Sequence, residues 1–168
     1  MKPAALALLL GAAACAPAAA PPRADRRQTI EGLTLSQSDA GKPAWTLRSR
    51  LAELLEEKNA ATLEAPSMEF YRDGRAVSRV TARTGEIATD THDVTLSSSV
   101  VLNSFEDRSV LTTDSLSYSS KDRLFRTRDD VTVRRPEGVV HGRGMEATPD
   151  LSEIRIFQQR SVLSGKPR

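Results

Sequence analysis

Few side chains in this sequence are of the types that carry out covalent or metal chemistry. The two histidines, His92 and His141, lie far apart, and neither a His-Glu-x-x-His motif nor a cysteine pair accompanies them. Two aspartate pairs stand at the expected ends of strands, where aspartate favours turns: Asp90/Asp93 and Asp129/Asp130. There is no Gly-x-Ser-x-Gly nucleophile motif. The sequence therefore predicts a protein that is not an enzyme, with no catalytic residue, no metal and no cofactor.

The one residue with a clear candidate chemistry is the sole cysteine, Cys15, as a site of lipid attachment. It follows a basic residue, Lys2, and an uncharged run from Ala4 to Ala14. This run is shorter than the about 20 apolar residues that cross a bilayer, and it is typical of a secretory signal. The segment is similar to a bacterial lipoprotein signal, which is cut so that the cysteine becomes the first residue. An ordinary signal cut within Ala16 to Ala20 is the alternative.

The residues after Cys15 predict a tether followed by a single domain. Residues 15–28 are rich in Pro and Ala, which favour extended chain over a packed core. We therefore expect a signal peptide at 1–14, the lipidated cysteine and tether at 15–28, and a domain at 29–168. The 24 Lys and Arg residues are interspersed with 22 Asp and Glu residues. Charge mixed in this way argues against a nucleic-acid partner.

The body of the sequence carries the pattern of half-buried strands. From Ala76 onward, apolar and polar residues alternate in short runs separated by Asp, Gly, Ser and Asn. The runs recur every 31 residues, as in Val94, Phe125 and Ile156, and again in Val100, Val131 and Val162. Each unit is a strand, a turn and a second strand, and it must stack on its neighbours to bury its apolar face. The prediction is an all-β domain built from repeated antiparallel strand pairs.

Period-two alternation places the apolar residues of these strands on one inward face. The face expected to line a lipid-binding groove consists of Ala82, Val94, Leu96, Val100, Leu102, Leu116, Tyr118, Phe125, Val131, Val133, Ile156 and Val162. Composition alone favours the alternative, a normally packed core. Upstream, Trp45, Leu47 and Leu51 alternate as in a strand, while good helix formers give residues 45–59 a helical pattern as well. Both readings of that segment stay open.

With the strands laid out, five short motifs and a closing valine follow one another in a specific order. They are Trp45-Thr-Leu47, Tyr71-Arg-Asp-Gly74, Thr81-Ala82-Arg-Thr-Gly85, Leu111-Thr-Thr-Asp-Ser-Leu116-Ser-Tyr118, Gly142-Arg-Gly144 and Val162. In order and spacing this set resembles LptC, the periplasmic component of the lipopolysaccharide transport system, and more loosely the OstA-like domains of its partners. Many members of that family keep an N-terminal membrane helix, whereas this chain has a lipoprotein-like signal.

The resemblance implies an open, twisted β-jellyroll with structural turns at Gly74, Gly85, Gly142 and Gly144. It implies that acyl chains of lipopolysaccharide bind in the groove. The expected partners are the permeases of the inner-membrane ABC transporter and a periplasmic LptA-like bridge protein. The chain is expected in the periplasm, anchored by lipid to the inner membrane, with the outer membrane as the alternative. A structural lipoprotein or assembly scaffold with a filled core is the second hypothesis.

Overall fold

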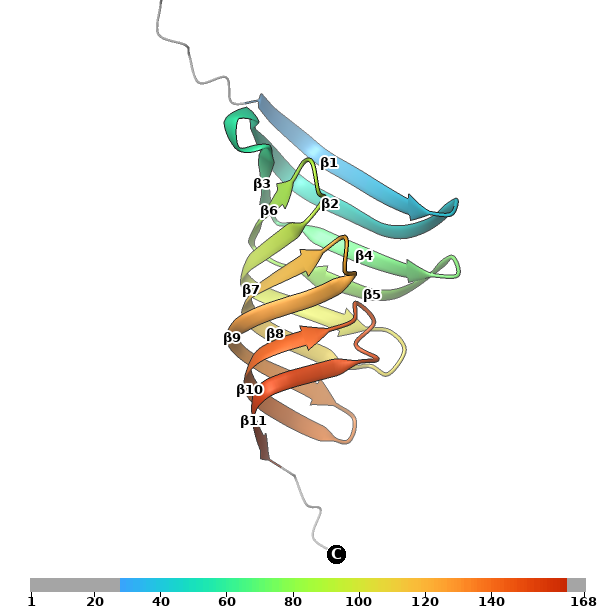
Figure 1. The fold of residues 1–168 in the computed structure, drawn as a ribbon, viewed down its shortest axis with the longest axis vertical. Helices are drawn as coiled ribbons and strands as arrows, with labels where there is room; N and C mark the ends of the chain where they lie inside the picture. The colour runs from blue at the N-terminus through green and yellow to red at the C-terminus, as the bar shows by residue number, and fades with distance from the viewer. Residues whose placement is uncertain (1–27, 163–168) are drawn as a thin grey trace, which may run out of the picture.

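The fold consists of antiparallel strands joined into one sheet (Figure 1). The computed structural model describes residues 28–162, with side chains up to residue 160. The strands are β1 (Gln28–Asp39), β2 (Lys42–Leu55), β3 (Ala60–Glu64), β4 (Ser67–Arg72), β5 (Arg75–Thr81), β6 (Thr84–Ala88), β7 (Val94–Ser104), β8 (Val110–Ser119), β9 (Leu124–Arg135), β10 (Gly138–Ala147) and β11 (Ile154–Val162). The expectation of an all-β, open and twisted jellyroll is confirmed.

The segment that the sequence left open, residues 45–59, is mostly strand. Trp45, Leu47 and Ser49 are buried on alternate positions of β2, and a single 3-10 turn, Glu56–Lys58, follows. The helical propensity of this segment is overridden because β2 pairs along both edges, with β1 on one side and with β3 and β4 on the other. Burial between strands outweighs a weak local preference.

Strands β2 and β7 each pair with two short strands, and this divides the sheet into two walls. In the first wall, residues 45–48 of β2 pair with β4, and residues 101–104 of β7 pair with β5. In the second wall, residues 51–55 of β2 pair with β3, and residues 94–97 of β7 pair with β6. The long strands therefore cross from one wall to the other along a corner. Figure 1 shows them stacked from β1 at the top to β11 at the bottom.

The corner is made by irregular backbone at matching places in successive strands. The register of β7 against β8 shifts between Ser97 and Val100, where Ser98 and Ser99 both have positive φ. The register of β10 against β9 shifts beside Gly144, which has φ +73°. Bulges of this kind bend a strand sharply while pairing continues on both sides. The repeat of 31 residues seen in the sequence therefore corresponds to two strands and two crossings of the corner.

Buried hydroxyl side chains bond to backbone carbonyl oxygens near the bends. The Ser49 hydroxyl donates to the carbonyl oxygens of Leu51 and Glu64, at 2.6 and 2.8 Å. The Thr113 hydroxyl donates to the carbonyl of Asp130 at 2.9 Å. An unpaired buried backbone carbonyl would be costly, so these hydroxyls stabilise the corner. They explain polar residues at positions where a regular strand would carry apolar ones.

Candidate lipid-binding face and its side opening

The structure gathers most of the residues predicted for the groove on one continuous inner face. Nine of them belong to a single buried cluster: Val94, Leu96, Val100, Leu102, Leu116, Tyr118, Phe125, Val131 and Val133. Ala82 and Ile156 are half-buried and pack against that cluster. Val162 pairs through its backbone with Val139, and its side chain lies outside the described part of the structure. Cys15 also lies outside the described residues.

Three aromatic rings meet in the interior between the walls. Phe70, on β4 of the first wall, meets Tyr118 and Phe125 of the second wall at ring-centroid distances of 4.9 and 5.3 Å. Tyr118 and Phe125 are themselves 5.3 Å apart. Burial raises the pKa of Tyr118 to about 12, so its hydroxyl is neutral at physiological pH. In this state the walls are held together by packed side chains.

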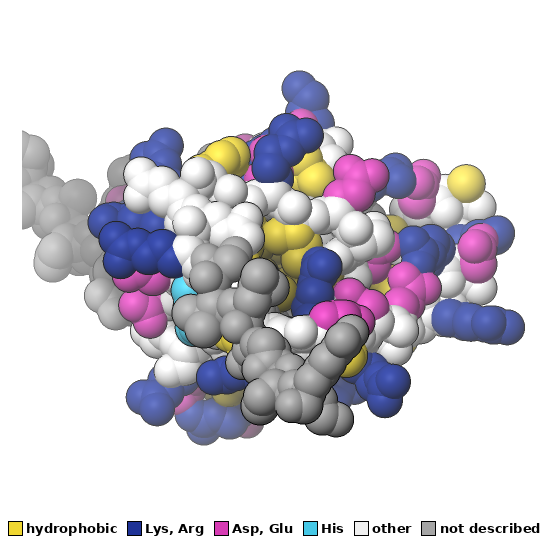
Figure 2. Space-filling model, turned by 90° about the horizontal axis from the view of Figure 1, so that it is seen from below, with side chains coloured by type: hydrophobic (Ala, Val, Ile, Leu, Met, Phe, Trp, Pro, Cys, Tyr) yellow, Lys and Arg dark blue, Asp and Glu magenta, His cyan; other side chains and the backbone are white. Residues whose placement is uncertain are grey.

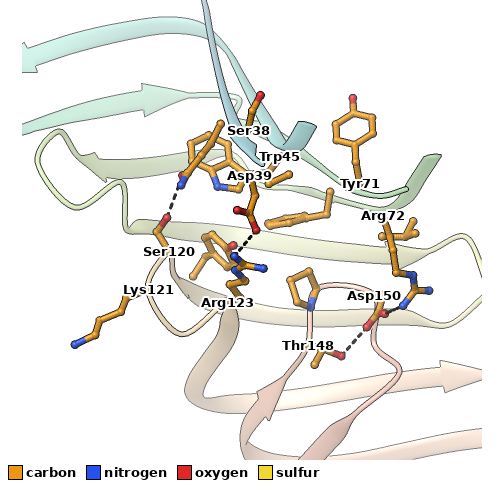
Figure 3. Close-up of a pocket in the computed structure, with 16 residues that line it drawn as sticks. Ser38, Asp39, Trp45, Tyr71, Arg72, Ser120, Lys121, Arg123, Thr148 and Asp150 are labelled. Carbon is orange, nitrogen blue, oxygen red and sulfur yellow. Dashed lines mark hydrogen bonds and ion pairs between the residues drawn. The ribbon is translucent and has the colours of Figure 1, made fainter. Parts of the chain in front are cut away.

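A side opening lies where hairpin tips of the two walls approach each other (Figure 3). Its volume is about 460 Å³. The apolar part of its lining includes Trp45, Phe70 and Tyr118, which are 2, 4 and 4% exposed. Sequence reasoning did not find this opening, because its residues come from turns far apart in the chain.

Charged residues join the two walls across this opening. Arg123, in the β8–β9 turn, pairs with Asp39 at the end of β1 at 2.5 Å. Arg72, at the end of β4, pairs with Asp150 of the β10–β11 turn at 2.6 Å, and also with Glu106. A hydrogen bond of 3.1 Å between Ser120 and Gln37 adds a neutral link. Figure 3 shows the Arg123–Asp39 and Arg72–Asp150 pairs at separate places along the opening, with Lys121 extending away from it.

The Asp150 carboxylate is fixed by its own turn as well as by Arg72. Thr148 and Ser152 donate hydrogen bonds to it at 2.6 and 2.8 Å. Partial burial opposes ionisation, but the hydrogen bonds from Thr148 and Ser152 and the charge of Arg72 outweigh it and lower the pKa of Asp150. Asp150 is therefore ionised over the whole physiological pH range.

The two ends of the inner face are edge strands with half-buried apolar side chains. Among the strands that the structure describes, β1 pairs only with β2, and β11 only with β10. Leu33 and Leu35 of β1 and Ile154 and Ile156 of β11 pack against the core while remaining partly exposed. Figure 2, seen from below, shows apolar side chains in the middle of that view with charged side chains around them. Exposed edges of this type favour pairing with another sheet.

Comparison with known proteins identifies the family. The family model described as "Lipopolysaccharide-assembly, LptC-related" matches residues 8–162, which is most of the chain. The chain belongs to the LptC-related family. None of the curated proteins compared with it matches. Membership gives the protein a role in lipopolysaccharide assembly and transport in the cell envelope, as a non-enzymatic component that works with the other proteins of that system.

The glycines of the LptC-related motifs serve different purposes. Gly74 lies in the β4–β5 turn with φ +77°, and Gly144 forms the bend of β10 with φ +73°. Gly85 and Gly142 lie inside strands, which corrects their expected placement in turns. A Cβ at Gly142 would lie 2.2 Å from Cγ2 of Ile156, and one at Gly85 would lie 3.0 Å from the carbonyl oxygen of Thr95. These two glycines are needed for close approach rather than for a turn.

The residue types that could hold a metal are dispersed. Within residues 28–162, no group of three or more His, Cys, Asp or Glu side chains is arranged to bind a metal ion. His92 is exposed in the β6–β7 turn, and His141 is exposed with Nδ1 3.0 Å from the Thr132 hydroxyl. Over the same residues, no helix has the length and apolar character needed to cross a membrane.

Proposed function

We propose that this protein carries lipopolysaccharide across the periplasm by binding its acyl chains between the two walls of the jellyroll. The observation that supports this best is the inner apolar face, which continues from Leu33 and Leu35 on β1 to Ile154 and Ile156 on β11. Because the same strand pair repeats along the face, bound acyl chains meet similar surroundings at each step. Lipid can then move along the face without exposure to water, while the transporter supplies the energy.

The free energy gained by burying an acyl chain is larger than the free energy of the exposed ion pair that joins the walls, which favours a carrier whose walls separate. Each buried methylene is worth about 0.8 kcal/mol, so an acyl chain of about a dozen carbons costs on the order of 10 kcal/mol to expose to water. Exposed ion pairs such as Asp39–Arg123, with side chains 57 and 68% exposed, are each worth about 0–1 kcal/mol. Acyl chains replace protein–protein contacts with protein–lipid contacts. The Asp39–Arg123 pair therefore presents only a small barrier to loading.

We propose that the two edge strands dock to neighbouring jellyrolls. Because the Pro/Ala tether leads into β1, we propose that this end faces the inner-membrane transporter and that β11 faces an LptA-like bridge protein. Backbone pairing along an edge strand joins sheets end to end without a dedicated sequence motif. It would also continue the apolar face from one domain into the next.

The proposed anchor is lipid on Cys15, following a signal at residues 1–14, with residues 15–28 as the tether to the domain at 29–168. A single acyl chain gives only marginal membrane attachment, whereas two or three hold a protein firmly. We propose the inner membrane as the anchoring membrane, because the β1 edge would then lie close to the transporter.

A second candidate function is an assembly scaffold whose core stays filled. The packing of Phe70 against Tyr118 and Phe125 favours this candidate, since these rings occupy the space that acyl chains would take. Mass spectrometry of the full-length protein purified from a lipopolysaccharide-producing host separates the two functions. A carrier retains acylated lipid in a defined ratio to protein, and a scaffold is recovered lipid-free. Recovery of lipid-free protein at every detergent concentration would contradict the carrier function.

A further inference from the structure

The side opening has the two features of a site for an anionic amphiphile. Its floor is aromatic, with Trp45, Phe70 and Tyr118 all nearly buried. Its sides carry the guanidinium groups of Arg72 and Arg123. A volume of about 460 Å³ lies within the range of ordinary small-molecule pockets. The chemistry of the lining suits a ligand with an apolar chain and a negatively charged head.

Both guanidinium groups already pair with carboxylates of the opposite wall, and Arg72 also pairs with Glu106 of the β7–β8 turn. Arg123 pairs with Asp39 and Arg72 with Asp150, each link joining the first wall to the second. The Arg123 and Asp39 side chains are 68 and 57% exposed, so water competes for them and their pair is weak. A phosphate group carries more negative charge than a carboxylate and also forms bidentate hydrogen bonds with arginine. It could therefore displace either carboxylate.

We propose that the side opening binds the phosphorylated head of an acylated lipid, with Arg72 and Arg123 exchanging Asp150 and Asp39 for phosphate. This exchange removes the charged links between the two walls at the opening, where an acyl chain then enters between them. The proposal rests on the proposed carrier function and specifies a lateral entrance for it. The carboxylates act as competitors that hold the opening shut until the ligand replaces them. Asp150 is the firmer competitor, since Thr148 and Ser152 hold its carboxylate in place.

If the carboxylates compete with the ligand, removing a carboxylate should raise the affinity for lipid, and removing an arginine should lower it. Asp39→Asn removes a competitor and should strengthen binding of diphosphorylated lipid A to the full-length protein about threefold to tenfold. Arg123→Gln removes a ligand contact and should weaken binding by a similar factor. Trp45 is the only tryptophan of the chain and lies in the lining, so its fluorescence reports on the site directly. Titration with lipid A measures each affinity.

Asp73→Asn is the matched control, because it removes the same charge from a neighbouring hairpin tip. Asp73 pairs with Lys42, and their side chains are 81 and 69% exposed, away from the lining. The affinity of the Asp73→Asn variant for lipid A should equal that of the unaltered protein. Equal strengthening by Asp39→Asn and Asp73→Asn would show a general effect of net charge and overturn the proposal.

Three further probes identify the ligand chemistry. Lipid A stripped of phosphate should lose the sensitivity to Asp39→Asn. Deacylated lipid A should keep that sensitivity but bind more weakly than lipid A, because it has no chain to enter between the walls. Phosphatidylglycerol binding as tightly as lipid A, with the same dependence on Arg123, would overturn the assignment to the lipopolysaccharide head. If lipid A reaches the inner face but neither Arg nor Asp variants alter its affinity, the carrier function stands and the lateral entrance is wrong. Circular dichroism confirms that each variant is folded.

Discussion

Phe70 and Phe125 meet edge to face across the interior, with ring centroids 5.3 Å apart and ring planes at 76°. Phe70 comes from β4 of the first wall and Phe125 from β9 of the second wall. Both rings are nearly fully buried. This contact is therefore a direct apolar link between the walls, and it occupies space on the inner face that the carrier function assigns to lipid.

Removing one of these rings should destabilise the domain strongly. Phe125→Ala leaves a cavity in a fully buried site and should lower the free energy of unfolding by about 3–5 kcal/mol, measured by urea denaturation. Phe157→Ala is the control, because that ring is 64% exposed, and it should change the free energy of unfolding by less than about 0.5 kcal/mol. Similar losses for both variants would mean that the interior is not packed as described.

A methyl group at Gly142 should be far more damaging than a side chain at Gly74. Gly142→Ala forces a Cβ to within 2.2 Å of Ile156 and 2.8 Å of the Gln158 carbonyl oxygen, so β10 and β11 must separate. We expect a loss of about 1–3 kcal/mol in the free energy of unfolding. At Gly74, Asn tolerates the positive φ and nothing lies within 4 Å, so Gly74→Asn should be close to neutral. Equal melting temperatures for the two variants would contradict this account.

The strand pattern and the repeat were readable from the sequence because each apolar face is local and periodic. The equal spacing of Val94, Phe125 and Ile156 is enough to predict that they occupy equivalent positions in alternate strands. The bends were harder to predict. Ser98 and Ser99 adopt positive φ because two walls must meet there, and serine has no strong local preference for that conformation. The local pattern of residues 45–59 allowed a helix, and only pairing with β1, β3 and β4 decides for a strand.

The side opening could not be predicted from the sequence at all. Arg72 and Asp150 are separated by 78 residues, and Asp39 and Arg123 by 84. Interspersed charges of both signs are typical of any solvated surface, so nothing marks these two pairs among the others. Their proximity follows from how far the jellyroll curls, which depends on the bends at the corner.

Acid should weaken the outer face of the first wall through Glu69. Hydrogen bonds from Arg79 and Tyr71 lower the pKa of Glu69 below its ordinary value of 4.5. The ionised carboxylate therefore stabilises the fold above that pH, and the stabilisation is lost as the pH falls through the lower pKa of the folded state. Glu69→Gln should cost about 1 kcal/mol or less at neutral pH, and this difference should shrink towards pH ~3.

Thermal melting across this pH range tests the Glu69 prediction. Glu86→Gln is the matched control, since it removes the same charge from an exposed position on β6. If the gap between Glu69→Gln and the unaltered protein stays constant down to pH ~3, the carboxylate does not contribute in the way that its hydrogen bonds indicate.

Replacement of Cys15 by Ser should free the protein from the membrane. The unaltered protein is expected to sediment with membranes, and Cys15→Ser should appear in the soluble periplasmic fraction, because the tether itself carries no apolar run. Labelling with a radioactive or clickable fatty acid should be lost together with sedimentation. Membrane fractionation that persists without the label would contradict a covalent anchor.

Photo-crosslinking from two adjacent positions of β11 tests the carrier function most directly. Ile156 is half-buried on the inner face, and Phe157 is exposed. A photoreactive residue at Ile156 should capture lipopolysaccharide in cells, as should one at Val100 or Val131, whereas one at Phe157 or the exposed Thr95 should not. Capture on the inner face alone is the result that we predict. Equal capture at Ile156 and Phe157, or none at the inner positions, would show that the inner face is a permanently filled core and that lipid is not carried there.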